Sequence, residues 1–292
     1  MIINDDKIIE HFGAEFYNKV IANLPKYAER WDLSNFEQID YYSLSCLFTC
    51  VSTEYDACVL KFGTHLDMVE DEYHMLKDYD GNGLCKVYEV DVDNGVLLIE
   101  RITPGTQLCE EPNQNIRIDE FCLLFQKLHK PSMYKDKYLT YMERASEVVA
   151  FIKTRSDYVE LYHKMVKAEE ILHPLWEKYT KRLLLHGDLH HENILLGKDG
   201  YCAIDPVGII GDPVFDISMF IIDEVDWDKE GNYDYIVRTI SEKLDICEKD
   251  IRALVYAELC LLNCLFVEDG EYDEVDLDEI ILVERMMNSE AV

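Results

Sequence analysis

The fold of this chain is decided by the stretch Leu185-His186-Gly187-Asp188-Leu189-His190-His191-Glu192-Asn193-Ile194-Leu195-Leu196, which Tyr201-Cys202-Ala203-Ile204-Asp205-Pro206 soon follows. The apolar runs at 183–185 and 194–196 predict short buried strands, and a third strand is expected at 201–204. The polar residues between the first two strands must then form a loop that is held at both ends. This arrangement predicts that Asp188, Asn193 and Asp205 project from rigid positions toward one point.

These three side chains have the chemistry that phosphoryl transfer needs. Four residues separate Asp188 from Asn193, which is the spacing of phosphotransferase catalytic loops. We assign Asp188 as the catalytic base for the acceptor hydroxyl, and Asn193 and Asp205 as the hard oxygen ligands of magnesium. The alternative is that Asp188 and Asn193 only stabilise a turn. His186-Gly187 before them and Asp205 after them favour the phosphotransferase.

At these residues the chain resembles the aminoglycoside phosphotransferase superfamily, whose members phosphorylate small molecules. His-Gly-Asp at 186–188 stands where protein kinases have His-Arg-Asp, and Ile204-Asp205-Pro206 stands where they have Asp-Phe-Gly. The run at 208–216 narrows the resemblance to the aminoglycoside/hydroxyurea group, which includes streptomycin 6-phosphotransferases. The runs at 24–33 and 254–270 resemble the same group, although no Trp occurs in the second.

The resemblance implies an α+β, two-lobed protein-kinase-like fold, with a small five-stranded antiparallel N-lobe and a larger, mostly helical C-lobe. We place the leader helices and the nucleotide-binding N-lobe at 1–101. The helical C-lobe, with the catalytic loop and the acceptor-binding site, is expected at 102–292. Two residues are given structural roles: His186 braces the catalytic loop, and Asp216 fastens it from below and caps the next helix. The alternative for the cap is Asp212, before a helix that begins at Pro213.

Residue patterns place most elements of the N-lobe. A leader helix is expected at about 5–24, where Pro25 should end it or begin a new turn, and the strand-like pattern begins at Phe36. Asp93-Asn94-Gly95 is a strong hairpin turn signal. The strands are expected at 44–52, 56–62, 85–92 and 96–101, and a helix at 67–79.

Lys61 lies among apolar residues of a predicted strand, where a Lys is costly unless it has a partner. In a kinase such a Lys reaches the α- and β-phosphates and is held by a helix carboxylate. Glu72 is the favoured partner because Glu-x3-Leu matches the family pattern. Glu70 and Asp71 remain open as alternatives.

The nucleotide site departs from the family at the loop that should cover the phosphates. No glycine occurs between Gly13 and Gly63, so the expected glycine-rich loop is absent. The candidate cover is the run at 42–46, in which the hydroxyls of Ser43 and Ser45 can donate hydrogen bonds. 

The run at 100–105 looks like the hinge, where backbone groups of Glu100 and Ile102 would bind adenine. The alternative is a strand end followed by a Pro-Gly turn. The implied cofactors are ATP and Mg²⁺.

The composition limits the partners. A formal net charge of −31 makes nucleic acid and anionic membranes poor partners and fits a small cationic substrate. The ten cysteines form no C-x-x-C pair, so reduced thiols are expected. The N-terminus lacks the pattern of a signal peptide, and no apolar run is long enough to span a membrane. We therefore expect a cytoplasmic protein. A monomer or a weak dimer is expected, although no sequence pattern decides between them.

Acidic residues near the C-terminus are candidates for binding a cationic substrate, because carboxylates bind ammonium and guanidinium groups. A solvated acidic loop is the alternative. His190-His191 is not expected to bind a metal, because adjacent histidines do not easily face one point. The substrate candidates are Glu268, Asp269 and Glu271, with Asp223 and Glu224 as further possibilities.

Together these patterns favour ATP- and Mg-dependent transfer of a γ-phosphoryl group to a hydroxyl of a small cationic molecule. An aminoglycoside such as streptomycin is the best single candidate, and its phosphorylation would inactivate the antibiotic. One alternative is a kinase of a metabolite such as choline or an amino sugar. The other is a non-catalytic binding protein with a kinase fold, which only the missing glycine loop supports.

Overall fold

The computed structural model describes residues 5–40 and 44–288 and divides the chain into two compact lobes. The N-lobe contains residues 1–106 together with 195–207, and the C-lobe contains residues 107–194 and 208–292. The segment 195–207, which carries Asp205, therefore folds with the N-terminal part of the chain rather than with the catalytic loop that precedes it.

The N-lobe is built on an antiparallel sheet of five strands, as predicted, in the order β1-β2-β3-β5-β4. Strand β4 begins two residues later than expected, because Cys85 donates its backbone N–H to the backbone oxygen of Ala203, outside the sheet. The predicted turn before β5 is confirmed, with Gly95 at φ 67°. The strands are β1 (Leu33–Gln38), β2 (Ser45–Ser52), β3 (Asp56–Gly63), β4 (Val87–Asp91) and β5 (Val96–Glu100).

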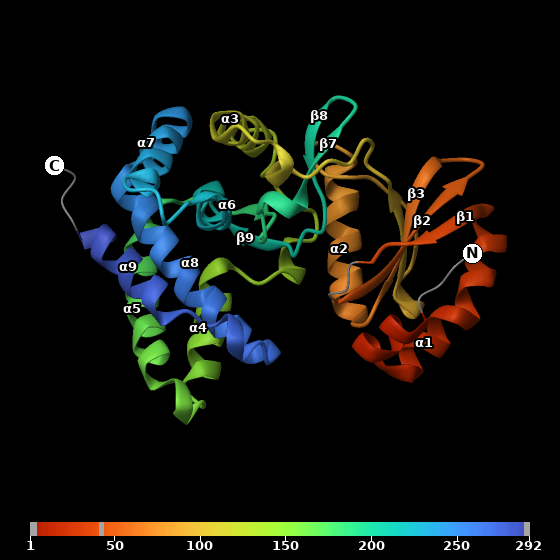
Figure 1. Cartoon of the computed structure of the whole chain (residues 1–292), viewed down its shortest axis with the longest axis horizontal. Helices are drawn as coiled ribbons and strands as arrows, with labels where there is room; N and C mark the ends of the chain where they lie inside the picture. Colours follow the sequence, from red (N-terminus) through yellow and green to blue (C-terminus); the bar gives the residue numbers. More distant parts are fainter. Residues whose placement is uncertain (1–4, 41–43, 289–292) are drawn as a thin grey trace. The chain divides into compact units, whose positions relative to one another are not determined.

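One helix packs on each face of this sheet (Figure 1). Helix α1 (Asp5–Arg30) shares a core with Phe48, Leu60 and Phe62. Because side chains alternate along a strand, Lys61 points to the other face. There α2 (Leu66–Tyr79) presents Glu72 among its buried residues.

The prediction that the leader helix stops at Pro25 is wrong. Helix α1 continues through Pro25 to Arg30, and its backbone departs from helical geometry at Gly13 instead. An interior proline costs a helix about 3 kcal/mol. The residues that follow it offset this cost, because the rings of Tyr27 and Trp31 are buried and Tyr27 contacts Phe62 on the sheet.

The C-lobe is mostly helical and is organised around α8, which is buried along most of its length and packs against α4, α5, α6, α7 and α9. No helix in the described residues is long and apolar enough to cross a bilayer. The helices are α3 (Gln114–Phe125), α4 (Tyr141–Ile152), α5 (Val159–Lys178), α6 (Ser218–Glu224), α7 (Asn232–Leu244), α8 (Glu248–Asp269) and α9 (Leu277–Asn288).

Short strands flank the catalytic loop, close to the predicted positions. β6 (Leu183–Leu185) enters the loop and pairs antiparallel with β9 (Ile209–Gly211). β7 (Ile194–Gly197) leaves the loop and pairs with β8 (Gly200–Ala203), and Asp205 follows two residues after β8. Regular structure thus holds both ends of the loop.

We expect Gly63→Ala to destabilise the N-lobe by about 1–3 kcal/mol, because overpacking a core has costs of this size. A methyl group at Gly63 would lie 2.3 Å from Cγ2 of Val69, a residue that is only 3% exposed. Urea unfolding measures the loss. The double variant Gly63→Ala/Val69→Ala should be more stable than additivity predicts, and strictly additive losses would contradict this explanation.

Candidate active site

The catalytic loop is fastened to the C-lobe by the carboxylate of Asp216. Its Oδ2 accepts a hydrogen bond from the backbone N–H of His186 at 2.7 Å, and its Oδ1 accepts one from Gly187 at 2.8 Å. Nε2 of His129 lies 2.9 Å from the same Oδ2. Gly187 has φ 82°, a conformation that favours glycine. These are the contacts expected of a residue that holds the loop from below.

Asp216 remains ionised although it is buried. Burial raises the pKa of this carboxyl, but the hydrogen bond and charge of His129, the charge of His186 and the N–H of Gly187 outweigh burial, and the net pKa is lowered. The expectation that Asp216 also caps the next helix is wrong, because α6 has no side-chain cap. Asp212 caps the preceding turn by accepting the N–H of Val214.

Asp188 and Asn193 are held together within the loop. Nδ2 of Asn193 donates to the backbone oxygen of Asp188 at 3.0 Å and to its Oδ2 at 3.1 Å. The N–H of Asp188 donates to Nδ1 of His186 at 3.3 Å, so His186 braces the loop from inside. The side chain of Asp188 is 36% exposed and accessible to a small molecule.

In the N-lobe the structure brings Lys61 together with Glu72 and Asp205. Nζ of Lys61 lies 2.8 Å from Oε2 of Glu72, and it also contacts Oδ1 of Asp205. Glu72 is thus the helix partner, rather than Glu70 or Asp71. Burial opposes the charge of Lys61, but the two carboxylates outweigh it and raise the pKa of the amine. The convergence of Asp205 with Asp188 and Asn193, which belong to the other lobe, stays a prediction.

The other predicted nucleotide-binding residues are distributed along the N-lobe. Ser43 lies outside the described residues, and Ser45 is the first residue of β2 and is 8% exposed. Glu100 ends β5, and its Oε2 accepts the N–H of Lys86 at 3.2 Å. Ile102 follows beside Gly197, where a methyl group would lie 3.6 Å from Cγ2 of Ile102. Their roles in binding nucleotide stay predictions.

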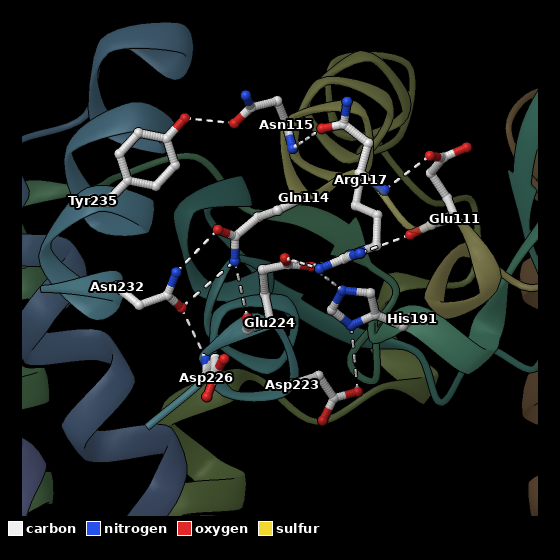
Figure 2. A network of polar contacts seen from close by, with 11 residues as sticks. Glu111, Gln114, Asn115, Arg117, His191, Asp223, Glu224, Asp226, Asn232 and Tyr235 are labelled. Carbon is white, nitrogen blue, oxygen red and sulfur yellow. Dashed lines mark hydrogen bonds and ion pairs between the residues drawn. The ribbon is translucent and has the colours of Figure 1, made fainter. Parts of the chain in front are cut away.

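A second set of contacts, which we did not predict from the sequence, ties the loop to α6 and α3 (Figure 2). Nε2 of His191 lies 2.6 Å from Oε2 of Glu224. Arg117 donates to both carboxylate oxygens of Glu224, at 2.8 and 2.6 Å, and to the backbone oxygen of Glu111. The bidentate geometry makes this a strong pair. Glu224 is therefore occupied by the protein itself.

His190, the residue before His191 on the loop, faces Asp223, which precedes Glu224 on α6. Burial lowers the pKa of His190, but the hydrogen bond with Asp223 and the charges of Asp188 and Asp223 outweigh burial, and the net pKa is raised. The pKa of Asp223 is lowered, because contacts with His190 and His191 outweigh its burial. The sequence signal for this set was a pair of adjacent histidines and a pair of adjacent acids, residues 223 and 224.

The predicted substrate residues lie at the exposed end of α8. Glu268 and Asp269 are its last two residues, and Glu271 follows the capping Gly270. Among the described residues, none of the three acids forms a hydrogen bond or ion pair with the catalytic loop. Glu258, ten residues before Glu268 and so about 15 Å along the helix axis, is close enough to Asp188 to feel its charge.

Glu258 belongs to a buried polar pair beneath the loop. The hydroxyl of Tyr141 donates to its Oε2. A small cavity of about 10 Å³, room for about one water molecule, is lined by both residues and by Arg144, Gly187 and Asp216. Burial raises the pKa of Glu258 to about 7, against the effects of Tyr141 and Arg144.

Comparison with known proteins agrees with this geometry. Residues 30–270 match the family model described as aminoglycoside/hydroxyurea antibiotic resistance kinase. The chain belongs to this family. The resemblance stated from the sequence is confirmed, and the kinase is a phosphotransferase that acts on hydroxyl groups.

Curated relatives are distant. The kinase is 24% identical to hydroxyurea phosphotransferase of Kitasatospora aureofaciens, over 92% of this chain and 81% of that protein. It is 23% identical to streptomycin 6-kinase of Streptomyces griseus, over 88% of each. The kinase is 29% identical to streptomycin 3''-kinase of Klebsiella pneumoniae over 50% of this chain, and the matched part covers 53% of that relative.

Solved structures show the same fold. Choline kinase LicA from Streptococcus pneumoniae matches with a TM-score of 0.67 at 16% identity, over 93% of this chain and 97% of that one. A mutant of aminoglycoside phosphotransferase APH(4)-Ia, in complex with ADP and hygromycin B, matches with a TM-score of 0.67 at 13% identity, over 92% and 99%. The two-lobed protein-kinase-like α+β fold is thus confirmed.

We expect Asp216→Asn to destabilise the kinase by about 2–3 kcal/mol and to lower its turnover, because an amide cannot accept both loop N–H groups and leaves buried groups unsatisfied. Thermal unfolding and ADP release measure the two effects. Asp228→Asn removes the same charge at an exposed position and serves as the matched control. Wild-type stability in Asp216→Asn would contradict the fastening role.

We expect Glu258→Gln to gain stability relative to the wild type as the pH rises. The pKa of Glu258 is raised from 4.5 to about 7 on folding, so its contribution is full below pH 4.5 and is lost as the pH rises through 7. Gln still accepts the Tyr141 hydroxyl but cannot ionise. The relative gain between pH 4.5 and 8 should reach up to roughly 3 kcal/mol in urea unfolding.

Glu268→Gln, on the exposed end of the same helix, is the control for this experiment and should show no such trend. An equal stability difference between Glu258→Gln and the wild type at every pH would show that the buried carboxyl does not titrate as expected.

Proposed function

We propose that this kinase transfers the γ-phosphoryl group of ATP, with Mg²⁺, to a hydroxyl of a small cationic molecule, with streptomycin as the best candidate acceptor. The observation that carries the proposal is the partly exposed carboxylate of Asp188, fixed by Asn193 on a loop that Asp216 fastens. A base in this position can accept the proton of a bound hydroxyl.

The chain's own residues supply the other parts of the reaction. Lys61, kept in place and charged by Glu72, would bind the α- and β-phosphates. Backbone groups near Glu100 and Ile102 would bind the adenine ring. Asp188 would orient the acceptor hydroxyl and take its proton, and Asp216 would preserve the loop geometry during this step.

The available oxygen ligands suit magnesium. Because Nδ2 of Asn193 donates to Asp188, the amide is oriented, and its Oδ1 has no hydrogen bond among the described residues. Asp205 adds a carboxylate. The described residues hold no group of three or more His, Cys, Asp or Glu that could bind a metal, so the remaining ligands would be phosphate oxygens and water. The bound ion would neutralise charge that develops on the transferred phosphoryl group.

A cationic acceptor fits the charge around the base. Asp188 and Asp223 are both partly exposed in the C-lobe, and Glu192 is exposed on the same loop. The names of two relatives, streptomycin 6-kinase and streptomycin 3''-kinase, support an aminoglycoside of this kind. Phosphorylation of such a drug would inactivate it.

A panel of acceptors tests the substrate. ADP release with Mg-ATP is followed for streptomycin, hydroxyurea, choline and glucosamine, and resistance to streptomycin is measured in a sensitive host. We expect streptomycin to be turned over. Turnover of choline or glucosamine alone would establish a metabolite kinase instead. Calorimetry that shows no binding of Mg-ATP would support a non-catalytic binding protein, against which the Lys61–Glu72 pair argues.

We expect Asp188→Asn to lower kcat on the order of 10²–10³-fold or more while Mg-ATP still binds, because the amide cannot take the hydroxyl proton. Steady-state ADP release and calorimetry measure the two quantities. Asp199→Asn, an equal charge change in the exposed turn after β7, should behave like the wild type. Full turnover by Asp188→Asn would refute the base.

A further inference from the structure

The imidazole of His190 lies between two carboxylates of the C-lobe. Its Nδ1 is 3.2 Å from Oδ2 of Asp223, and its Nε2 is 3.6 Å from Oδ2 of Asp188. The first distance allows a hydrogen bond and the second is an ion-pair distance. The side chain is 19% exposed, so water has limited access to it. Both ring nitrogens therefore face acids.

The backbone of His190 is fixed on both sides. Its N–H donates to the backbone oxygen of Asp188 at 3.2 Å, and its own oxygen accepts the N–H of Asn193 at 3.1 Å. The ring therefore starts from a defined position. Asp223 adds a contact from a different element, because it belongs to α6, whose last residue Glu224 is clamped by Arg117.

The two carboxylate oxygens of Asp188 differ in their contacts. Oδ2 accepts the amide of Asn193 and faces His190, whereas Oδ1 has no hydrogen bond or ion pair among the described residues. Two groups thus hold one oxygen and leave the other for the acceptor. Rotation of the carboxylate would exchange the oxygens, and His190 and Asn193 together oppose this rotation through their contacts with Oδ2.

We propose that His190, anchored by Asp223, is a positioning residue that fixes the carboxylate of Asp188 with Oδ1 toward the acceptor hydroxyl. This inference rests on the proposed function, since it assumes that Asp188 is the base. It also gives the His190-His191 motif a role: His191 ties the loop to Glu224 and lies 3.6 Å from Asp223, and His190 ties the base to Asp223.

The test is the steady-state kinetics of His190→Ala, with ADP release followed both with streptomycin and with water as the only acceptor. We expect kcat to fall about 10–100-fold, since a misplaced catalytic group has a cost of this order. KM for ATP and for streptomycin should stay within about threefold, because positioning acts on the transition state. His190→Gln, whose amide can donate to both carboxylates, should recover part of the loss.

His173→Ala, at an exposed position on α5, is the matched control and should keep wild-type kinetics. Asp223→Asn should lower kcat in the same way, and the double variant His190→Ala/Asp223→Asn should lose little more than His190→Ala alone, because the two residues act as a unit. Additive losses would overturn the anchoring by Asp223.

A wild-type kcat in His190→Ala, or a loss confined to the KM for ATP, would overturn the positioning role. Asp188→Asn separates this result from failure of the proposed function. If Asp188→Asn is inactive and His190→Ala is fully active, only the positioning role is wrong. If Asp188→Asn is fully active, the base assignment fails and the role of His190 fails with it.

Discussion

Two backbone N–H groups of the catalytic loop, those of His186 and Gly187, are held by the single carboxylate of Asp216. That carboxylate is buried and stays charged because His129 lies against it. The loop in turn orders Asp188 and Asn193, which hydrogen-bond to each other. A buried charge with full hydrogen bonding is thus the support on which the chemistry of the C-lobe depends.

The acidic side chains of the catalytic loop and of its supporting residues, and the one that pairs with Lys61, have two different roles. Asp216, Glu224 and Glu72 are buried and each is paired with a basic group, so they order the structure. Asp188 is partly exposed, and its Oδ1 has no hydrogen bond or ion pair among the described residues, so it can meet a ligand. The acidic residues that give the chain its large negative charge therefore do not all have the same function. Partner groups decide whether a given carboxylate is structural or available for chemistry.

Sequence patterns predicted those strands, turns and helices whose formation depends on residues close to one another in the sequence. The strands around the loop, the turn at Gly95 and the helix that carries Glu72 were all found close to their expected positions. Pro25 misled the prediction because tertiary packing of the next residues outweighs the cost of a proline in a helix.

The partners of the loop could not be predicted because they come from distant parts of the sequence. His129 lies 87 residues before Asp216, and Arg117 lies 107 residues before Glu224. Neither residue has a sequence signal of its own. His190 and His191 were noticed as a pair, but only the fold shows that both rings lie beside Asp223 of α6 and that His191 also contacts Glu224.

The division of the chain has a consequence for its synthesis. The N-lobe needs residues 195–207, in which Ala203 exchanges backbone hydrogen bonds with Gly83 and Cys85, and Asp205 contacts Lys61. A ribosome must therefore translate the first 88 residues of the C-lobe, 107–194, before the N-lobe has all of its parts. Lys61 in the nascent N-terminal sheet therefore lacks Asp205, one of its two counterions, until more than two thirds of the polypeptide has been made.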